Sequence, residues 1–293
     1  MAYTNNPQAP KVRRDAAFFA VRHGVRVAAR RFGVSPGTIT KWVKRARKIG
    51  YHPIPTKSPR PKKHPKTLSK KKVDAIVLTR QKVKRSAEVV HAILLEQGIE
   101  VSLSSVKRTL DRHHLIKKRS PWKRYHPPSD RPLADHPGAL VQADTIHLMR
   151  SDGTRIYIFT LIDLYSRWAH AWATERVNTR TALLFVKRAQ RLAPFLFECI
   201  QTDHGPEFSA SFTDRVSMRH RHSRVRKPND NAHVERFNRT IQTELVHKLP
   251  VDVYALNKKL PEYLKWYNGE RHHFGLKLKK PDQILEECFQ AID

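Results

Sequence analysis

The sequence of 293 residues contains only two cysteines, Cys199 and Cys288, and neither has another Cys or a His at metal-site spacing. This excludes a disulfide framework and a zinc site, and with the zinc site a zinc hydrolase. No apolar run is long enough to cross a membrane, and the first residues lack the apolar core of a signal peptide. We therefore expect a reducing, cytoplasmic setting and no membrane partner.

Acidic residues are also scarce, with 26 Asp and Glu against 57 Lys and Arg, which gives a net charge of +31. Residues 1–130 hold 32 basic and 7 acidic residues, a net of +25, whereas residues 131–293 hold 25 and 19, a net of +6. The positive charges of residues 1–130 repel one another unless this part of the chain binds a polyanion. The charge therefore predicts nucleic-acid binding. A Gly-rich phosphate loop ending in Lys-Ser or Lys-Thr is absent, so no nucleotide cofactor is expected.

Residues 11–50 have the pattern of a helix-turn-helix domain. Helices are predicted at 12–22 and 26–32, and Ser35 and Pro36 mark the start of a third. In that third helix, one face is apolar and packs inward. The outward face suits the DNA major groove and its phosphates, although a basic helical bundle with a solvated face is the alternative. The candidate DNA-binding residues on this face are Thr38, Thr40, Lys41, Lys44, Arg45 and Lys48.

A basic, Pro-rich linker is predicted at 51–68, because Pro at this density stays extended and packs no core. Residues 69–118 then form a second three-helix unit, with Ser69, Ser86 and Ser102 at the helix starts. Its candidate DNA-binding residues are Lys107, Arg108 and Arg112, and protein contact is the alternative role. A second linker at 119–137 contains Trp122 and Tyr125, which pack against a neighbouring domain or stack on unpaired bases.

Three acidic residues stand out in the remaining part of the chain. Asp144 lies inside a strand-like run, Asp203 ends another, and Glu235 lies in the second turn of a helix that Asp230 or Asn231 caps. That helix has an apolar stripe, so the Glu235 carboxylate would lie at the edge of a core, as a surface charge or as part of a metal site. Carboxylates are the ligands that Mg2+ prefers, and two such ions can act on a phosphodiester. The three acids together suggest phosphoryl transfer on nucleic acid.

The runs Val-Gln-Ala-Asp144-Thr, Thr-Asp203-His-Gly-Pro-Glu-Phe and Asp-Asn-Ala-His-Val-Glu235-Arg-Phe-Asn-Arg-Thr resemble the integrase core of DDE transposases. The run from Ile162 to Arg167 is similar to the second core strand of that family, whose members include bacterial insertion-sequence transposases and retroviral-type integrases. The resemblance covers roughly residues 130–290. The unit at 69–118 also resembles the second helix-turn-helix that precedes insertion-sequence integrase cores.

The resemblance implies a multidomain chain: α-helical helix-turn-helix units, then an α/β ribonuclease-H-like DDE core at 138–248 with a helical extension at 249–293. Within the core we expect a hairpin turn at Asp152-Gly153, strands at 155–164 and 168–174, and a helix at 179–192. Asp144, Asp203 and Glu235 would be the catalytic residues and the ligands of two Mg2+ (or Mn2+) ions. The activity implied is 3′-end cleavage of element ends and strand transfer into target DNA.

The same resemblance implies double-stranded DNA partners, at least a dimer on DNA, and a prokaryotic, nucleoid-associated location. Arg239 and Gln242 become candidate DNA contacts. The sequence departs from the family at two points: Asp203 and Glu235 are a few positions closer than usual, which predicts a shortened loop around 218–227, and Gln242 replaces a common Lys or Arg. These departures motivate one alternative, an inactive transposase-derived DNA-binding protein. The other is a metal-dependent nuclease that cuts without joining.

Several further polar residues are interpreted as structural. Asp163 is predicted to pair with Arg167, and Glu207, Asp214 and Asp230 are predicted in turns or caps. Of these, Glu207 is the least secure, because it is close to Asp203 in the sequence. Aromatic residues Tyr263, Trp266 and Tyr267 have helical spacing and are expected to pack inward. For Arg271, His272 and His273, DNA contact stays an open possibility.

Overall fold

The computed structural model describes residues 6–56, 67–116, 132–224 and 228–291 and divides into two compact units, Met1–Ser69 and Lys70–Asp293. Within these described ranges no helix combines the length and apolarity that crossing a membrane requires. The predicted linker residues Trp122 and Tyr125, and part of the predicted short loop, lie outside the described residues.

The first unit consists of three helices, α1 (Ala9–His23), α2 (Val25–Arg31) and α3 (Pro36–Lys48). The Oγ atom of Ser35 accepts a hydrogen bond from the backbone N–H of Thr38, as expected for the cap of α3. Ile39, Trp42 and Ala46 are buried among alanines of α1 and α2. Residues 51–56, predicted as linker, pack onto this unit, because Ile54 is fully buried and its N–H donates to the carbonyl of Pro10.

A second group of three helices opens the larger unit: α4 (Lys70–Val83), α5 (Ala87–Glu96) and α6 (Leu103–Arg112). Ser102 caps α6 with its side chain, whereas the Ser86 side chain makes no such cap bond to α5. Ile76, Val90, Leu94, Val106 and Leu110 are all fully buried and form the apolar interior of this group.

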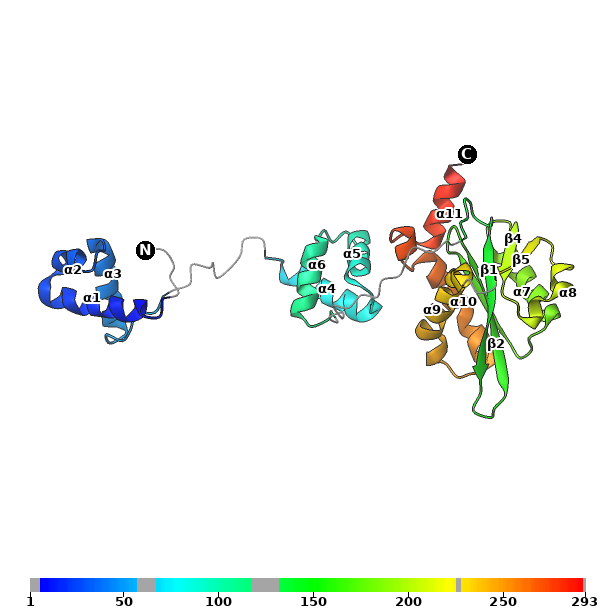
Figure 1. Ribbon diagram of the computed structural model, residues 1–293, viewed down its shortest axis with the longest axis horizontal. Helices are drawn as coiled ribbons and strands as arrows, with labels where there is room; N and C mark the ends of the chain where they lie inside the picture. Colours follow the sequence, from blue (N-terminus) through cyan, green and yellow to red (C-terminus); the bar gives the residue numbers. More distant parts are fainter. Residues whose placement is uncertain (1–5, 57–66, 117–131, 225–227, 292–293) are drawn as a thin grey trace. The chain divides into compact units, whose positions relative to one another are not determined.

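A five-stranded mixed sheet forms the centre of the rest of the chain (Figure 1). Its order is β3-β2-β1-β4-β5, in which β1 to β3 are antiparallel and β4 and β5 run parallel to β1. The strands are β1 (Val141–Met149), β2 (Arg155–Asp163), β3 (Ala169–Thr174), β4 (Cys199–Thr202) and β5 (Arg219–His222). This arrangement resembles the ribonuclease-H-like integrase core that the sequence predicted.

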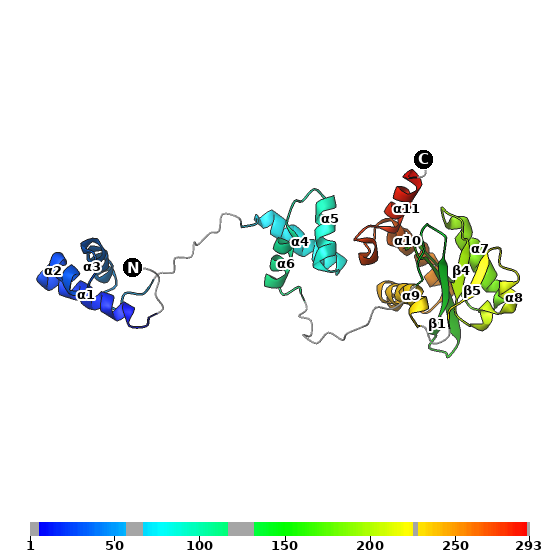
Figure 2. The ribbon, with the colours of Figure 1, turned by 45° about the horizontal axis from the view of Figure 1, so that its top comes forward.

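Helices cover both faces of the sheet, and both views show α9 and α10 on one side and α7 and α8 on the other (Figures 1 and 2). The helices are α7 (Thr179–Leu192), α8 (Ala210–Thr213), α9 (Ala232–Glu244), α10 (Val253–Gly269) and α11 (Pro281–Gln290). Two apolar clusters result, one with Val234, Phe237 and Ile241 of α9 and one with Phe185 of α7. A sheet covered on both faces explains why β2 is buried at nearly every position.

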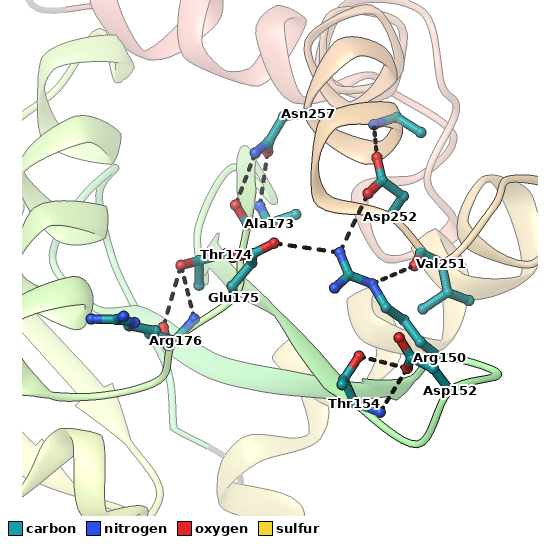
Figure 3. A network of polar contacts seen from close by, with 11 residues as sticks. Arg150, Asp152, Thr154, Ala173, Thr174, Glu175, Arg176, Val251, Asp252 and Asn257 are labelled. Atoms are coloured by element: carbon teal, nitrogen blue, oxygen red, sulfur yellow. Dashed lines mark hydrogen bonds and ion pairs between the residues drawn. The ribbon is translucent and has the colours of Figure 1, made fainter.

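Short 3-10 turns connect these elements at Pro206–Phe208, Pro228–Asn231, Val246–Lys248 and Phe274–Leu276. The β1–β2 hairpin turns at Gly153, whose φ of +81° favours glycine. At the turn end of that hairpin, Arg150 points toward Glu175 and the start of α10 (Figure 3). Its guanidinium donates to the Val251 carbonyl at 3.2 Å and pairs with Asp252, the cap residue of α10, at 3.3 Å. The hairpin and α10 are thereby held together.

Candidate active site

Asp144 lies in the middle of β1, half-buried, opposite Thr160 of β2. One carboxylate oxygen accepts from the backbone N–H of Thr145 at 2.8 Å, and the other accepts from Nδ2 of Asn238 at 2.8 Å. Burial, aided by the nearby carboxylates of Asp203, Glu235 and Glu207, raises the pKa of Asp144 to about 6. Acids of two other segments, Asp203 with Glu207 and Glu235 of α9, thus lie near enough to act on the Asp144 carboxylate.

Asp203 follows directly after β4, the parallel neighbour of β1, so the two strand-like runs predicted to carry Asp144 and Asp203 are adjacent in the sheet. Its carboxylate accepts from the backbone N–H of Gly205 at 3.0 Å. A Cβ at position 205 would lie 3.1 Å from Oδ1 of Asp203 and 2.8 Å from Oε2 of Glu207. The missing side chain of Gly205 therefore makes room for two carboxylates.

Glu207 was predicted to be a turn residue, and it does lie in the short 3-10 turn after Asp203, but its side chain is also buried beside that acid. It is only 5% exposed, and it lies close enough to raise the pKa of Asp144. We therefore count Glu207 as a fourth acid of this region. Its short distance from Asp203 in the sequence was the only available signal.

Glu235 is exposed and lies in the first turn of α9, one turn earlier than predicted, because the helix begins at Ala232. Neither proposed cap residue uses its side chain to cap α9. Asp230 is instead almost fully buried and accepts from the Arg224 guanidinium at 2.9 Å, a contact that holds the pKa of Asp230 at about 2.

Two buried glutamines hold the start of α9 on the sheet. Gln142 of β1 and Gln201 of β4 are register partners, and both Nε2 atoms donate to the carbonyl of Asp230. The Oε1 atom of Gln142 also accepts from the backbone N–H of Val234 at 3.1 Å. These bonds hold the start of α9 at Val234, the residue directly before Glu235. No local sequence pattern marks either glutamine as a functional residue.

Asn238 is one turn after Glu235 and joins α9 to both strands of the hairpin. It is 8% exposed; its Nδ2 donates to Asp144, and its Oδ1 accepts from Thr160 Oγ1 at 2.7 Å. An amide in this place orients the Asp144 carboxylate and keeps it hydrogen-bonded in a partly buried position.

Asp163 is fully buried and structural, as predicted; burial raises its pKa, and the charge of the nearby Arg167 opposes that rise, in line with the predicted pairing. Its carboxylate accepts from the N–H of Gly138 at 3.0 Å and from the N–H and hydroxyl of Ser166, each at 2.7 Å. Asp214 follows α8, where its backbone ends the helix. Neither side chain belongs to the group around Asp144.

The carboxylates fit a hard divalent cation in type but do not form a closed cage. In the described ranges no three His, Cys, Asp or Glu side chains are close enough together to hold an ion by themselves. Mg2+ commonly binds through one or two carboxylates, water and substrate phosphate, so an open group is compatible with it. Burial, with repulsion by the neighbouring acids, raises the pKa of Asp144, and a bound cation would offset both effects.

The candidate DNA-binding residues differ in how free their side chains are. Most are exposed, but Arg45 donates to the Pro55 carbonyl at 3.0 Å and Lys107 pairs with Glu88 at 2.7 Å. On α9, Arg239 is exposed, whereas Gln242 donates back to the carbonyl of Asn238 at 3.1 Å. The exposed members are Thr40, Lys41, Lys44, Lys48, Lys107, Arg108, Arg112 and Arg239.

The aromatic residues after α9 pack as predicted, with Tyr263 and Tyr267 buried. Arg271 does not face solvent: its guanidinium binds both carboxylate oxygens of Glu244, at 2.8 and 3.0 Å. His272 is only 4% exposed. Arg271 and His272 are therefore largely buried and make contacts within the larger unit.

Comparisons with known proteins agree with this architecture. Residues 134–228 match a family model described as integrase core domain, and residues 216–281 match a second model with the same description. The putative integrase ORF3 of Spiroplasma virus SpV1-C74 is 25% identical over 170 residues, covering 50% of this chain and 47% of the relative. The transposase for insertion sequence element IS904 of Lactococcus lactis subsp. lactis (strain IL1403) is 26% identical over 156 residues, covering 50% and 61%. Each match thus spans less than two thirds of the relative.

Among solved structures, a chain of the simian T-cell lymphotropic virus intasome is 20% identical, with a TM-score of 0.47 and coverage of 72% of this chain and 73% of that one. The catalytic core domain of HTLV-2 integrase, solved in complex with magnesium, is 20% identical, with a TM-score of 0.41 and coverage of 50% and 96%.

A mixed sheet with helices on both faces and two matches to the same domain description define this part of the chain as an integrase core domain. The chain belongs to the DDE-type transposases and integrases.

Proposed function

We propose that this protein is a DNA transposase or integrase that cleaves 3′ ends of an element and joins them to target DNA, with Asp144, Asp203 and Glu235 as catalytic residues. The observation that supports this most is that Asp144 on β1 and Asp203 after the neighbouring strand β4 lie beside the start of α9, where the carboxylates of Asp203 and Glu235 add to the burial that raises the pKa of Asp144. Such a group of carboxylates is suited to phosphoryl transfer with divalent ions.

Asp144, Asp203 and Glu235 would hold Mg2+ or Mn2+, two ions per site, and such ions stabilise the attacking and leaving oxygens of a phosphodiester. The protein's own contribution is to position these ligands. Asn238 orients Asp144, and the Gly205 N–H orients Asp203. The buried glutamines hold the start of α9, and with it Glu235, in place on the sheet. Glu207 adds a negative charge beside Asp203.

Double-stranded DNA is the proposed substrate, both as element ends and as target. The basic three-helix units, as helix-turn-helix modules, would bind the ends, and joining two ends requires at least a dimer on DNA. Two modules connected to one core raise the effective concentration of each at a bipartite site. No nucleotide cofactor enters this reaction.

One observation favours a second candidate, an inactive transposase-derived DNA-binding protein. Glu235 is exposed, and the acids do not close around a point in the described residues. The Gln242 side chain, moreover, is bonded to its own helix rather than left free. This candidate predicts salt-dependent binding to a specific end without any cut or joined product.

The test is a strand-transfer assay with labelled duplexes from the DNA that flanks the gene, a plasmid target and Mg2+ or Mn2+. We expect joined product from wild type, none from Glu235→Gln, and wild-type amounts from Glu262→Gln, an exposed acid on α10 that pairs with Lys259. If the wild-type protein binds DNA but forms no product, the inactive DNA-binding protein is the correct interpretation. If it cuts DNA but joins none, the protein is a nuclease.

A further inference from the structure

The helices α4 to α6 contact the integrase core through a few polar bonds that involve Arg85 and Glu96. Arg85, between α4 and α5, donates to the carbonyl of His272 at 2.9 Å and lies 4.0 Å from Glu244 at the end of α9. Glu96, at the end of α5, pairs with Lys280 at 2.9 Å and with Nε2 of His272 at 3.2 Å. The structure thus connects the second helical unit to the core by exchangeable ionic contacts rather than by a shared apolar core.

These contacts border a cavity of about 900 Å3, which we call the charged cleft. One wall comes from the end of α4 and from α5, and the other from the end of α9, α10 and the segment before α11. Its charged lining consists of Lys82, Lys84, Arg85, Lys248, Arg271 and Lys280 against Glu96, Glu244 and Glu270. Six cations and three carboxylates leave a net charge of +3.

Within the cleft, two guanidinium groups share one carboxylate. Arg271 binds both oxygens of Glu244, whereas Arg85 lies 4.0 Å from that acid and donates to a backbone carbonyl. Burial and the like charge of Arg271 lower the pKa of Arg85. A second anion beside Arg85 would therefore be favourable, and a phosphodiester carries one negative charge with oxygens that guanidinium groups bind well.

We propose that the charged cleft binds the phosphodiester backbone of duplex DNA, and that Glu96 holds it closed in the DNA-free chain by occupying Lys280 and His272. The carboxylates of Glu96 and Glu244 then stand where DNA phosphates bind after the cleft opens. This inference rests on the proposed function only in its choice of DNA as the partner. In this proposal, helices α4 to α6 and the core bind the same DNA duplex together.

The test measures binding of a fluorescent duplex to the full chain without divalent ions, at several salt concentrations. Arg85→Gln is expected to weaken binding about tenfold and to reduce the slope of log K against log salt by about 1, the signature of one lost phosphate contact. Glu96→Gln is expected to tighten binding several-fold. The controls are Lys259→Gln and Glu262→Gln, which change the same charges on the outer surface of α10, away from the cleft.

Because Arg85 also has contacts within the protein, Lys84→Gln serves as a second variant; Lys84 is exposed and lines the cleft. Small-angle scattering of Glu96→Gln without DNA checks for opening, seen as a larger radius of gyration than Glu262→Gln gives. The inference is overturned if the Arg85 and Lys84 variants bind like Lys259→Gln, or if Glu96→Gln binds no tighter than Glu262→Gln. A wild-type chain that binds no duplex at all would instead remove the proposed function.

Discussion

Replacing Gln142 by Met tests whether the position of α9 depends on buried amides. Met has a similar length but neither donates nor accepts a strong hydrogen bond. The substitution would leave the buried N–H of Val234 without its acceptor, which costs about 1–3 kcal/mol. The Asp230 carbonyl still accepts a hydrogen bond from Gln201. Losing the bond from Gln142 to this carbonyl therefore costs only about 1 kcal/mol more.

The free energy of unfolding of the core should therefore fall by about 2–4 kcal/mol, less than the typical stability of a domain. We expect a folded variant in which the start of α9 opens more often. A shift of Glu235 by about 1 Å is enough to lower the reaction rate about 100-fold. Amide hydrogen exchange over residues 228–245 and strand-transfer yield are the two measurements.

Gln190→Met is the matched control. Gln190 makes the same two kinds of bond, donating to the Phe195 carbonyl at 2.9 Å and accepting from the Phe197 N–H at 2.9 Å, but it lies on α7. This variant should lose comparable stability while exchange over 228–245 and activity stay unchanged. If Gln142→Met showed the same amide exchange over 228–245 and the same strand-transfer yield as Gln190→Met, the role assigned to the glutamines would be wrong.

Three further predictions concern other parts of the core. Gly205→Ala should lower strand transfer more than tenfold by displacing two carboxylates, with little change in melting temperature, whereas Gly37→Ala, which meets no atom within 4 Å, should leave activity intact. Arg150→Met should destabilise the core by about 1–2 kcal/mol in urea titrations, through lost bonds to Val251 and Asp252; no change would refute the role of this contact. Burial lowers the pKa of His170 to about 4, below its ordinary 6.5, so stability present above pH 6.5 falls as pH drops, by about 2 kcal/mol at pH 5. His170→Phe should flatten that pH dependence, and an unchanged profile would contradict the assignment.

The sequence predicted most of the core's elements because their patterns are strong. The helix at 179–192 was predicted with its observed bounds, and Asp144 lies within a strand and Asp203 directly after one, as expected. These segments combine apolar periodicity with clear start and stop signals.

What the sequence did not reveal depends on contacts between distant residues. Strand β5 was missed because Arg219–His222 is a run of Arg and His without apolar alternation, and its strand form comes from pairing with β4. The register of β1 and β4 brings Gln142 and Gln201 together, and no local pattern marks a Gln that will bond to a helix start. The buried state of Glu207 likewise depends on how the turn after Asp203 folds against the sheet.

The charge distribution within the core indicates that the core contributes less than residues 1–130 to the electrostatic part of DNA binding. Several of its arginines are held by acids of the same domain: Arg271 by Glu244, Arg224 by Asp230 and Arg150 by Asp252. Their charge is already compensated, so they release few counterions when DNA binds. The salt dependence of binding should therefore come mainly from residues 1–130, with their net charge of +25, and from the few cations of the charged cleft. An isolated core of residues 132–293 would then bind duplex DNA weakly and with a shallow salt slope, whatever the geometry of its acids.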